Sequence, residues 1–197
     1  MRLRFAGFGG QGIVLCGFVV GKAAMLDGRN SFHTQSYGSA SRGGLTTSDV
    51  GIEDGEIHDL VHDHLDLLVT MSQQSYDANR GALVEGGSLF YESALVQPSK
   101  DDLGALGLDA TDIAYKTFGR KVFSNILMIG FVNQIAGLVS HESLVRTVEE
   151  VVPPGTEEKN IAALEEGMRR GRELSATRRQ PVAATRSSSS DGGGAEG

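Results

Sequence analysis

Short apolar runs and longer mixed stretches alternate along the first 35 residues. Residues 3–6 read LRFA, a short mostly apolar segment that predicts a buried strand. Residues 12–26 are rich in small and apolar side chains, so we expect a helix that packs against a sheet. A turn at residues 28–30 leads to a second predicted strand at residues 31–35. A unit of this kind is expected to form a right-handed crossover with parallel strands.

Further apolar runs extend the predicted sheet. The nearly continuous apolar run at residues 65–71 is typical of a central strand that is covered on both faces. Residues 54–55 read DG, a hairpin signal, so residues 56–58 are expected to pair back with the preceding strand. Gly86 and Gly87 are expected to end the unit before the next strand. The remaining strands are predicted at residues 45–52, 88–91 and 112–115.

Helical patterns dominate the second half of the chain. Ser72 and Ser124 are predicted N-caps, and Pro153 and Pro154 stop an amphipathic segment. The helices are expected at residues 73–83, 126–138, 142–151 and 159–174. The pattern predicts a three-layer α/β/α Rossmann-like domain with a mostly parallel sheet over residues 1–174. Residues 175–197 are rich in serine, arginine and glycine, so we expect a disordered or extended tail.

Composition narrows the class of protein. The chain has 197 residues, of which 40% are apolar, enough for one core. Its net charge of −7 argues against a nucleic-acid partner, because phosphate binding needs clustered Lys and Arg. No apolar run reaches the roughly 18 residues of a membrane span. The N-terminus enters a strand at once and has no signal-peptide form, which indicates a cytoplasmic protein without a membrane partner.

The single cysteine excludes an internal disulfide and a four-cysteine iron–sulfur site within this chain. Cys16 lies in an apolar run, so it is interpreted as a buried small hydrophobe and not as a nucleophile. Residues 58–64 carry three histidines and two aspartates, and His58 and His62 would share a helix face. No cysteine accompanies them, so a solvated connector is favoured and no metal site is predicted.

A glycine-rich loop follows the first strand. Residues 7–12 read GFGGQG, which fits the G-x-G-x-x-G pattern. Successive backbone N–H groups at a helix N-terminus favour a phosphate or another anion. The alternative is a tight strand–helix turn that binds nothing. No acidic residue follows the second strand to bind a ribose, so the sequence points away from NAD or FAD.

Polar residues follow other predicted strands. Gln35, Ser36 and Tyr37 end the second strand, and Ser72 and Gln73 follow the central one. Parallel strands end at the same edge of a sheet, so these side chains are expected at one ligand-binding edge.

An arginine lies on the loop that follows the second strand. Arg42 precedes Gly43 and Gly44, which allow a ligand or another chain to approach the backbone closely. Its guanidinium suits a carboxylate or phosphate. The other interpretation is a surface arginine paired with a nearby acid.

These motifs, taken in order, resemble the gamma subunit of 2-oxoacid:acceptor oxidoreductases, the pyruvate/2-oxoglutarate ferredoxin oxidoreductase group. The resemblance spans roughly residues 3–170, and the TQSYG and RGG segments are more similar to 2-oxoglutarate-type than to pyruvate-type subunits. The segments that carry it are residues 7–13, 34–38, 42–44, 72–73, 125–130 and 160–167.

The chain departs from the pattern of that family at three places. Residues 39–41 read SAS, where the family often has Pro-Glu-Ala. Gln74 follows the serine–glutamine pair, where the family often has Glu. Gly119 is followed by Arg120, where the family usually has Gly-Asn. These departures leave the acyl substrate open among 2-oxoglutarate, pyruvate, branched-chain and aryl 2-oxoacids.

The resemblance implies an assembly that oxidatively decarboxylates a 2-oxoacid to an acyl-CoA and CO2. Thiamine diphosphate, Mg2+ and 4Fe–4S iron–sulfur clusters would lie on alpha, beta and ferredoxin-like delta subunits or their fusions, and coenzyme A would be the co-substrate. This chain would bind no cofactor alone and carry no catalytic residue of its own. Expected contacts with CoA or a partner active site are Gly9, Gly10, Gln11, Gln35, Ser36, Tyr37, Arg42, Gly43, Ser72, Gln73 and Asn125. A stand-alone Rossmann-like nucleotide-binding enzyme or regulator is the alternative, and a purely structural scaffold subunit is a third possibility.

Overall fold

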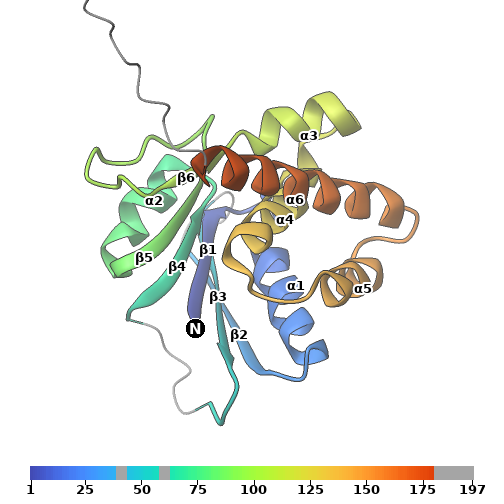
Figure 1. Ribbon diagram of the computed structural model, residues 1–197, viewed down its shortest axis with the longest axis horizontal. Coiled ribbons are helices and arrows are strands. Elements are labelled where there is room, and N and C mark those ends of the chain that lie inside the picture. The colour runs from blue at the N-terminus through green and yellow to red at the C-terminus, as the bar shows by residue number, and fades with distance from the viewer. Residues whose placement is uncertain (39–43, 58–62, 180–197) are drawn as a thin grey trace, which may run out of the picture.

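Six strands form one sheet in the computed structural model, which describes residues 1–38, 44–57 and 63–179. The strand order is β2-β3-β1-β4-β5-β6, so β1 and β4 are central, and β4 is the predicted central strand (Figure 1). The strands are β1 (Arg2–Phe8), β2 (Asn30–Tyr37), β3 (Leu45–Glu53), β4 (Leu65–Thr70), β5 (Leu83–Glu92) and β6 (Leu106–Leu108).

The sheet is mostly parallel, as predicted, with one inserted antiparallel strand. β1, β4, β5 and β6 pair in parallel. β3 pairs antiparallel with both β1 and β2, so β1 and β2 run in the same direction without touching. The prediction that these two strands run in the same direction is confirmed. They are not neighbours in the sheet, however, because β3 lies between them. A hairpin strand was predicted at residues 56–58, after Asp54 and Gly55. This prediction is wrong for Glu56 and Ile57, which form no strand. His58 lies outside the described residues.

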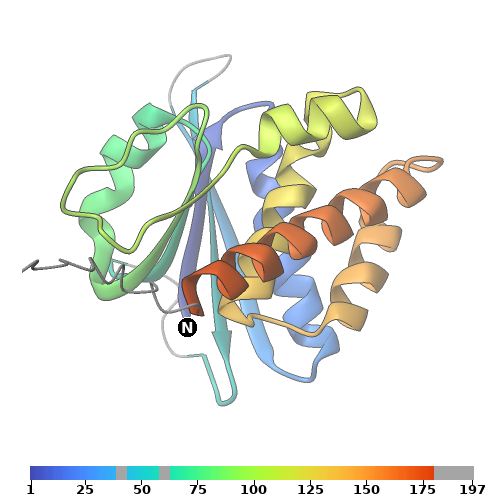
Figure 2. The same ribbon diagram turned by 45° about the horizontal axis from the view of Figure 1, so that its top comes forward.

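Helices cover both faces of the sheet and give three layers, as predicted. Figures 1 and 2 show α2 on one face and α1, α4, α5 and α6 on the other. The helices are α1 (Ile13–Leu26), α2 (Gln73–Asn79), α3 (Ala110–Phe118), α4 (Ser124–Ala136), α5 (His141–Val151) and α6 (Glu157–Arg179). The larger core lies between the sheet and α1, α4, α5 and α6, and a smaller one lies under α2.

The strand predicted at residues 112–115 is wrong, because this segment belongs to α3. Asp109 caps the helix by accepting a hydrogen bond from the Asp112 backbone N–H at 3.1 Å. Lys116 pairs with Asp112 one turn earlier at 2.6 Å, which adds support on the exposed face. The sixth strand is instead β6, just before the cap.

Other boundaries also differ from the sequence prediction, such as that of the helix predicted at residues 73–83, which ends at Asn79. Gly86 and Gly87 lie inside β5, where the pairing with β4 shifts register, so they do not precede the strand. α4 begins at Ser124 with Phe123 at the N-cap position, so Ser124 is the first helical residue and not the cap. The last helix was predicted to end at residue 174, but α6 continues to Arg179. The rest of the predicted tail, residues 180–197, lies outside the described residues.

α4 is held between the sheet and α6 by small residues. A Cβ atom on Gly130 would overlap the Leu164 carbonyl oxygen of α6, and one on Gly167 would overlap the Leu127 carbonyl oxygen of α4. Only glycine allows the two backbones to approach so closely. This packing fixes the N-terminal end of α4 beside the glycine loop, where the candidate site lies.

Candidate functional site

The carboxyl ends of five strands lie at one edge of the sheet. β1, β2, β4, β5 and β6 all run toward this edge, at the end of β1 away from its labelled N-terminus in Figure 1. The glycine loop follows β1, Ser72 follows β4, and Asp109 follows β6. Open α/β sheets bind ligands at such an edge.

The glycine loop is shaped by backbone hydrogen bonds. Gly9 N–H donates to the Gly44 carbonyl oxygen at 3.0 Å, and Gln11 N–H donates to the Phe8 carbonyl oxygen at 3.1 Å. Gly10 and Gly12 have φ values of 96° and 75°, which favour glycine. Gly12 is the N-cap of α1 and supplies no side-chain cap. The first N–H groups of α1 therefore keep the partial positive charge that attracts an anion.

Gln11 holds the loop against the neighbouring strand. Its Oε1 accepts a hydrogen bond from Phe8 N–H at 2.6 Å, and its Nε2 donates to the Met71 carbonyl oxygen at 2.9 Å. Both polar ends of the side chain are thus bound to backbone. The structure assigns Gln11 a positioning role, while the predicted ligand contact stays a prediction.

Asn125 reaches the loop from a distant part of the chain. It lies in the first turn of α4, is 4% exposed, and lines a cavity beside Gly12. A Cβ atom on Gly12 would overlap the Asn125 Nδ2 atom, so the two residues are in close contact. Asn125 Oδ1 accepts a hydrogen bond from Ile126 N–H at 2.8 Å. The structure brings together Asn125 and the glycine loop, while the predicted contact of Asn125 with CoA or a partner stays a prediction.

Two cavities flank the glycine loop. One of about 280 Å³ lies between the loop and the starts of α4 and α6, and Arg120, Asn125 and Asn160 provide its polar groups. The other, of about 380 Å³, has Gln11, Thr111 and Lys121 in its lining. Gly10 and Val122 line both. Sequence reasoning did not assign Arg120 or Lys121 to the site, although the Gly119–Arg120 departure was a signal.

The residues that end β2 lie apart from these cavities. Gln35, Ser36 and Tyr37 are exposed on β2, the strand at the edge of the sheet, and Tyr37 is 64% exposed. Neither cavity beside the loop has these residues in its lining. They therefore share neither of these cavities with Asn125.

Ser72 and Gln73 have structural partners. Ser72 Oγ accepts a hydrogen bond from Ser75 N–H at 3.2 Å, and Ser75 Oγ accepts one from Ser72 N–H at 3.2 Å. This capping box confirms the predicted N-cap. Gln73 Oε1 accepts a hydrogen bond from Gln97 N–H at 2.7 Å. Both residues lie after β4 as expected, and their contact with a ligand stays a prediction.

Some predicted residues cannot be placed. Arg42 and Gly43 lie outside the described residues, as do His58 and His62 of the histidine-rich segment. Within the described ranges, no group of three or more His, Cys, Asp or Glu side chains could hold a metal ion. Across the same ranges, no helix is both long and apolar enough to cross a membrane.

Glu92 is a buried carboxylate at the same edge that sequence reasoning missed. It ends β5, is fully buried, and accepts hydrogen bonds from the N–H and the Oγ1 of Thr111, both at 2.9 Å. Burial raises the pKa of Glu92 above the ordinary glutamate value, although these hydrogen bonds lower it in part. Thr111 lines the cavity of about 380 Å³, so its hydrogen bonds to Glu92 hold this part of the lining in position.

Cys16 lies under the loop and is not a nucleophile. It is 1% exposed, and burial raises the pKa of its thiol to about 12. Its Sγ lies 3.9 Å from the Asn125 carbonyl oxygen. The prediction of a buried small hydrophobe is confirmed.

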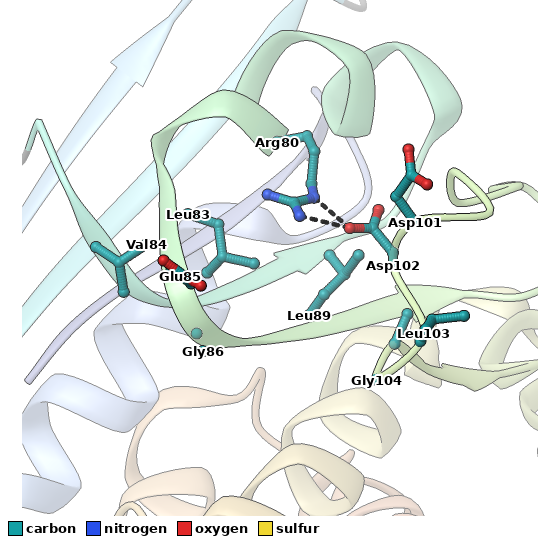
Figure 3. Close-up of a pocket in the computed structure, with 12 residues that line it drawn as sticks. Arg80, Leu83, Val84, Glu85, Gly86, Leu89, Asp101, Asp102, Leu103 and Gly104 are labelled. Carbon is teal, nitrogen blue, oxygen red and sulfur yellow. Dashed lines mark hydrogen bonds and ion pairs between the residues drawn. The ribbon is translucent and has the colours of Figure 1, made fainter.

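A third cavity, of about 540 Å³, lies at the other end of β5. Figure 3 shows Arg80 and Asp102 in contact with each other in its lining, with Leu83 and Leu89 nearby. Arg80 and Asp102 form an ion pair at 2.5 Å, and Tyr76 Oη donates a hydrogen bond to the same carboxylate at 2.5 Å. Arg80 and Asp102 neutralise each other, whereas Glu85 and Asp101 leave the lining with a net negative charge, and the lining includes no residue of the glycine loop.

Comparison with known proteins places the chain in a family. The family described as "Pyruvate ferredoxin/flavodoxin oxidoreductase" matches residues 2–170. The 2-oxoglutarate synthase subunit KorC of Methanocaldococcus jannaschii is 38% identical over 177 residues, which are 88% of this chain and 95% of the relative.

Solved structures share the fold. The crystal structure of the keto/oxoacid ferredoxin oxidoreductase gamma subunit from Geobacter sulfurreducens matches with a TM-score of 0.76 and 31% identity, over 87% of this chain and 98% of that one. A 2-oxoglutarate:ferredoxin oxidoreductase from Magnetococcus marinus, with 2-oxoglutarate, coenzyme A and succinyl-CoA bound, matches with a TM-score of 0.75. At 17% identity, over 90% of this chain and 31% of that one, this second likeness concerns the fold alone.

Proposed function

The chain belongs to the pyruvate ferredoxin/flavodoxin oxidoreductase family, and from this we propose that it is the non-redox gamma subunit of a CoA-acylating 2-oxoacid:acceptor oxidoreductase. The observation that carries the proposal is the match with the gamma subunit from Geobacter sulfurreducens over 98% of that chain. The unit that we assign to this function is the domain predicted at residues 1–174.

We propose 2-oxoglutarate as the substrate. The relative from Methanocaldococcus jannaschii is named a 2-oxoglutarate synthase subunit, and it matches over nearly its whole length. The TQSYG segment at residues 34–38 supports the same type. Most of the 2-oxoacid site would lie on other subunits, so the choice among 2-oxoacids is made by measurement on the complex.

The redox chemistry of the proposed complex belongs to other subunits. This sequence has one cysteine, and Cys16 is buried with a raised pKa, so it offers no ligand set for an iron–sulfur cluster. Thiamine diphosphate with Mg2+ would supply the decarboxylation and iron–sulfur clusters the electron transfer on the alpha, beta and delta partners. The resulting acyl group would leave as an acyl-CoA.

The contribution of this chain is binding and positioning at the carboxyl edge. The open N-terminus of α1, with Gly10 and Gly12, would bind an anionic part of CoA or of a partner's active site. Gln11 would hold that loop in shape, and Asn125 would contact the anion from the neighbouring cavity. The exposed end of β2, with Gln35 to Tyr37, and the segment of Arg42 and Gly43 would contact a partner subunit.

Co-purification tests the proposal. The tagged chain, expressed with its native partners, should carry thiamine- and cluster-bearing subunits at fixed stoichiometry. The complex should oxidise 2-oxoglutarate in a CoA-dependent reaction, faster than pyruvate or a branched-chain 2-oxoacid. Purification of the chain alone, with tight binding of NAD, FAD or S-adenosylmethionine, would instead identify a stand-alone nucleotide-binding protein. A preference for pyruvate would overturn only the assignment of the substrate.

A further inference from the structure

One edge of the sheet is long and regular. β2 (Asn30–Tyr37) forms this edge, and no described strand pairs with its outer side. It pairs with β3 residue by residue over its whole length, without a bulge. Its sequence, NSFHTQSY, contains no Pro, Asp, Glu, Lys or Arg, whereas the opposite edge strand, β6, has only three residues. Sheet edges are usually protected by short strands, charges, prolines or bulges, so the edge of β2 is suited to pairing with another chain.

Two hydrogen bonds show which backbone groups of β2 point outward. Gly38 N–H donates to the Leu45 carbonyl oxygen at 2.6 Å, so Gly38 faces β3. Ile52, opposite Ser31, donates its N–H to the Met1 carbonyl oxygen at 2.9 Å, on the side of β1. Inward and outward residues alternate in an antiparallel pair, so the odd-numbered residues of β2 direct their N–H and C=O groups outward. These residues are Ser31, His33, Gln35 and Tyr37.

The side chains of these odd-numbered residues lie on the face that α1 covers. A Cβ atom on Gly21 of α1 would lie 3.2 Å from Ser31 Oγ. Side chains alternate between the two faces of a strand, so Tyr37 lies on the same face as Ser31. Tyr37 is 64% exposed, so its ring is accessible to another chain.

An apolar cavity of about 310 Å³ lies between β2 and α1. It is lined by Phe18, Gly21, Lys22, Met25, Ser31, Phe32 and His33. Phe18 is 43% exposed and Met25 is 62% exposed, so apolar surface faces water here. Lys22 pairs with Glu150 at 2.5 Å, which neutralises its charge. The cavity therefore suits an apolar or aromatic side chain that enters from outside.

We propose that β2 pairs antiparallel with β2 of a second copy of this chain, around a two-fold axis at Thr34. This register uses every outward-facing residue, because Ser31 lies opposite Tyr37 of the second copy and His33 lies opposite Gln35 of the second copy. Directly opposed side chains lie on the same face of a sheet. The Tyr37 ring of the second copy therefore enters the cavity beside Ser31.

A second copy fits this edge for two reasons. The exposed Tyr37 ring and the cavity that receives such a ring lie at opposite ends of one strand, so a two-fold axis between them fills both cavities at once. β2 also carries no Asp, Glu, Lys or Arg, so self-pairing places no like charges opposite each other along the strand.

Disulfide cross-linking tests the register. Thr34→Cys in a Cys16→Ala background places two thiols opposite each other at the axis, where Cα atoms lie about 4.5 Å apart, within reach of a disulfide. Under mild oxidation, most of the full-length chain should run as a covalent dimer on a non-reducing gel. The matched control is Gln35→Cys in the same background, whose two thiols lie too far apart to react.

The outcomes of this cross-linking are distinct. A covalent dimer of Gln35→Cys without one of Thr34→Cys would overturn the register. No covalent dimer of either variant would overturn the pairing of the two strands.

Charge exchange at the axis tests the two-fold symmetry. Thr34 is exposed, so Thr34→Lys and Thr34→Asp should fold. Each places two like charges opposite each other and should raise the dissociation constant of the dimer at least about tenfold in analytical ultracentrifugation. An equimolar mixture of the two variants should dimerise again, because Lys then faces Asp. A wild-type chain that stays monomeric at about 0.1 mM would overturn the proposal.

Variants of Tyr37 test the cavity. Tyr37→Ala removes the ring and should raise the dissociation constant of the dimer at least about tenfold, whereas Tyr37→Phe keeps the ring and should stay within about threefold. Tyr115→Ala is the matched control, because Tyr115 is a 57% exposed tyrosine on α3, away from β2. Equal dissociation constants for Tyr37→Ala and Tyr115→Ala would overturn the role of the cavity.

The proposal does not rest on the function proposed above. Under that function the end of β2 contacts another subunit, and here that subunit is a second gamma subunit. Co-purification tests the function, whereas oxidation of the Thr34→Cys variant in the intact complex tests whether two copies of this chain meet. A cross-link to a different subunit, or none, would overturn the pairing even if the complex oxidises a 2-oxoacid.

Discussion

Single residues at the carboxyl edge divide into those that shape the glycine loop and those that line the cavities beside it. Gln11 belongs to the first group, because both ends of its side chain are bound to backbone. Arg120 and Asn125 belong to the second, because both line the cavity beside Gly12. The G-x-G-x-x-G pattern contains Gln11 at a variable position, so the pattern alone gives no sign of its positioning role.

Replacing Gln11 by Ala should destabilise the protein. The change leaves Phe8 N–H and the Met71 carbonyl oxygen without their partners, which costs about 2 kcal/mol. For a chain of this size the midpoint of thermal unfolding should fall by roughly 4–8 °C, measured by circular dichroism. Gln74→Ala, at an exposed position near the same edge, should change the midpoint by less than about 1 °C. Equal midpoints for Gln11→Ala and the wild-type protein would contradict the positioning role.

At the scale of elements, side chains at the end of a strand or helix connect it to the start of another helix. Glu92 joins the end of β5 to the start of α3 through Thr111, and it also accepts a hydrogen bond from Ala94 N–H at 3.3 Å. Asp27, after α1, accepts hydrogen bonds from the backbone N–H and the Oγ of Ser140 at the start of α5, both at 2.6 Å. The first junction lies at the carboxyl edge of the sheet, whereas the second joins α1 to α5 at the end of α1 away from the glycine loop.

The junction at Glu92 predicts a pH dependence of stability. Burial raises the pKa of Glu92 in the folded protein above 4.5, so the folded state binds more protons than the unfolded state between 4.5 and the raised pKa. The free energy of unfolding of the wild-type protein should therefore fall, relative to Glu92→Gln, as the pH rises through this window. Urea unfolding at several pH values measures the difference. A difference that does not change with pH would contradict the raised pKa, because other carboxylates cancel in the comparison.

At the scale of the whole molecule, two cores on opposite faces of one sheet hold the edge together. The larger core includes Cys16, the single thiol of the chain, under the glycine loop. Because Cys16 is 1% exposed, a reagent reaches it only when this layer opens.

Labelling of Cys16 should report the opening of the larger core. With a thiol reagent at pH 8, the native protein should react at least about a thousandfold more slowly than an exposed cysteine, because open states are rare and the pKa of the buried thiol is about 12. The control is Ala78→Cys in a Cys16→Ala background, which places a thiol on an exposed position of α2. Similar rates for the two proteins would show that the layer over the sheet is open in solution.

Errors in the predicted fold arose where a local pattern had two meanings. Residues 112–115 read as a strand by their apolar content, but the cap at Asp109 and the Asp112–Lys116 pair make them helical. Gly86 and Gly87 read as a break, although a strand with a register shift accommodates both. β3 was predicted as a strand, but its pairing partners depend on distant residues and no local pattern identifies them.

The sequence by itself determined the three layers, most strands and helices, the glycine loop and the family, because these depend on local periodicity and on motifs in order. Only the tertiary structure decided that β3 lies between β1 and β2, and that Asn125, Arg120 and Lys121 meet the loop of residues 9–12. More than 100 residues separate these groups in the chain. Their meeting follows from the packing of α4 against the sheet and α6, which is a property of the whole core and not of any one segment.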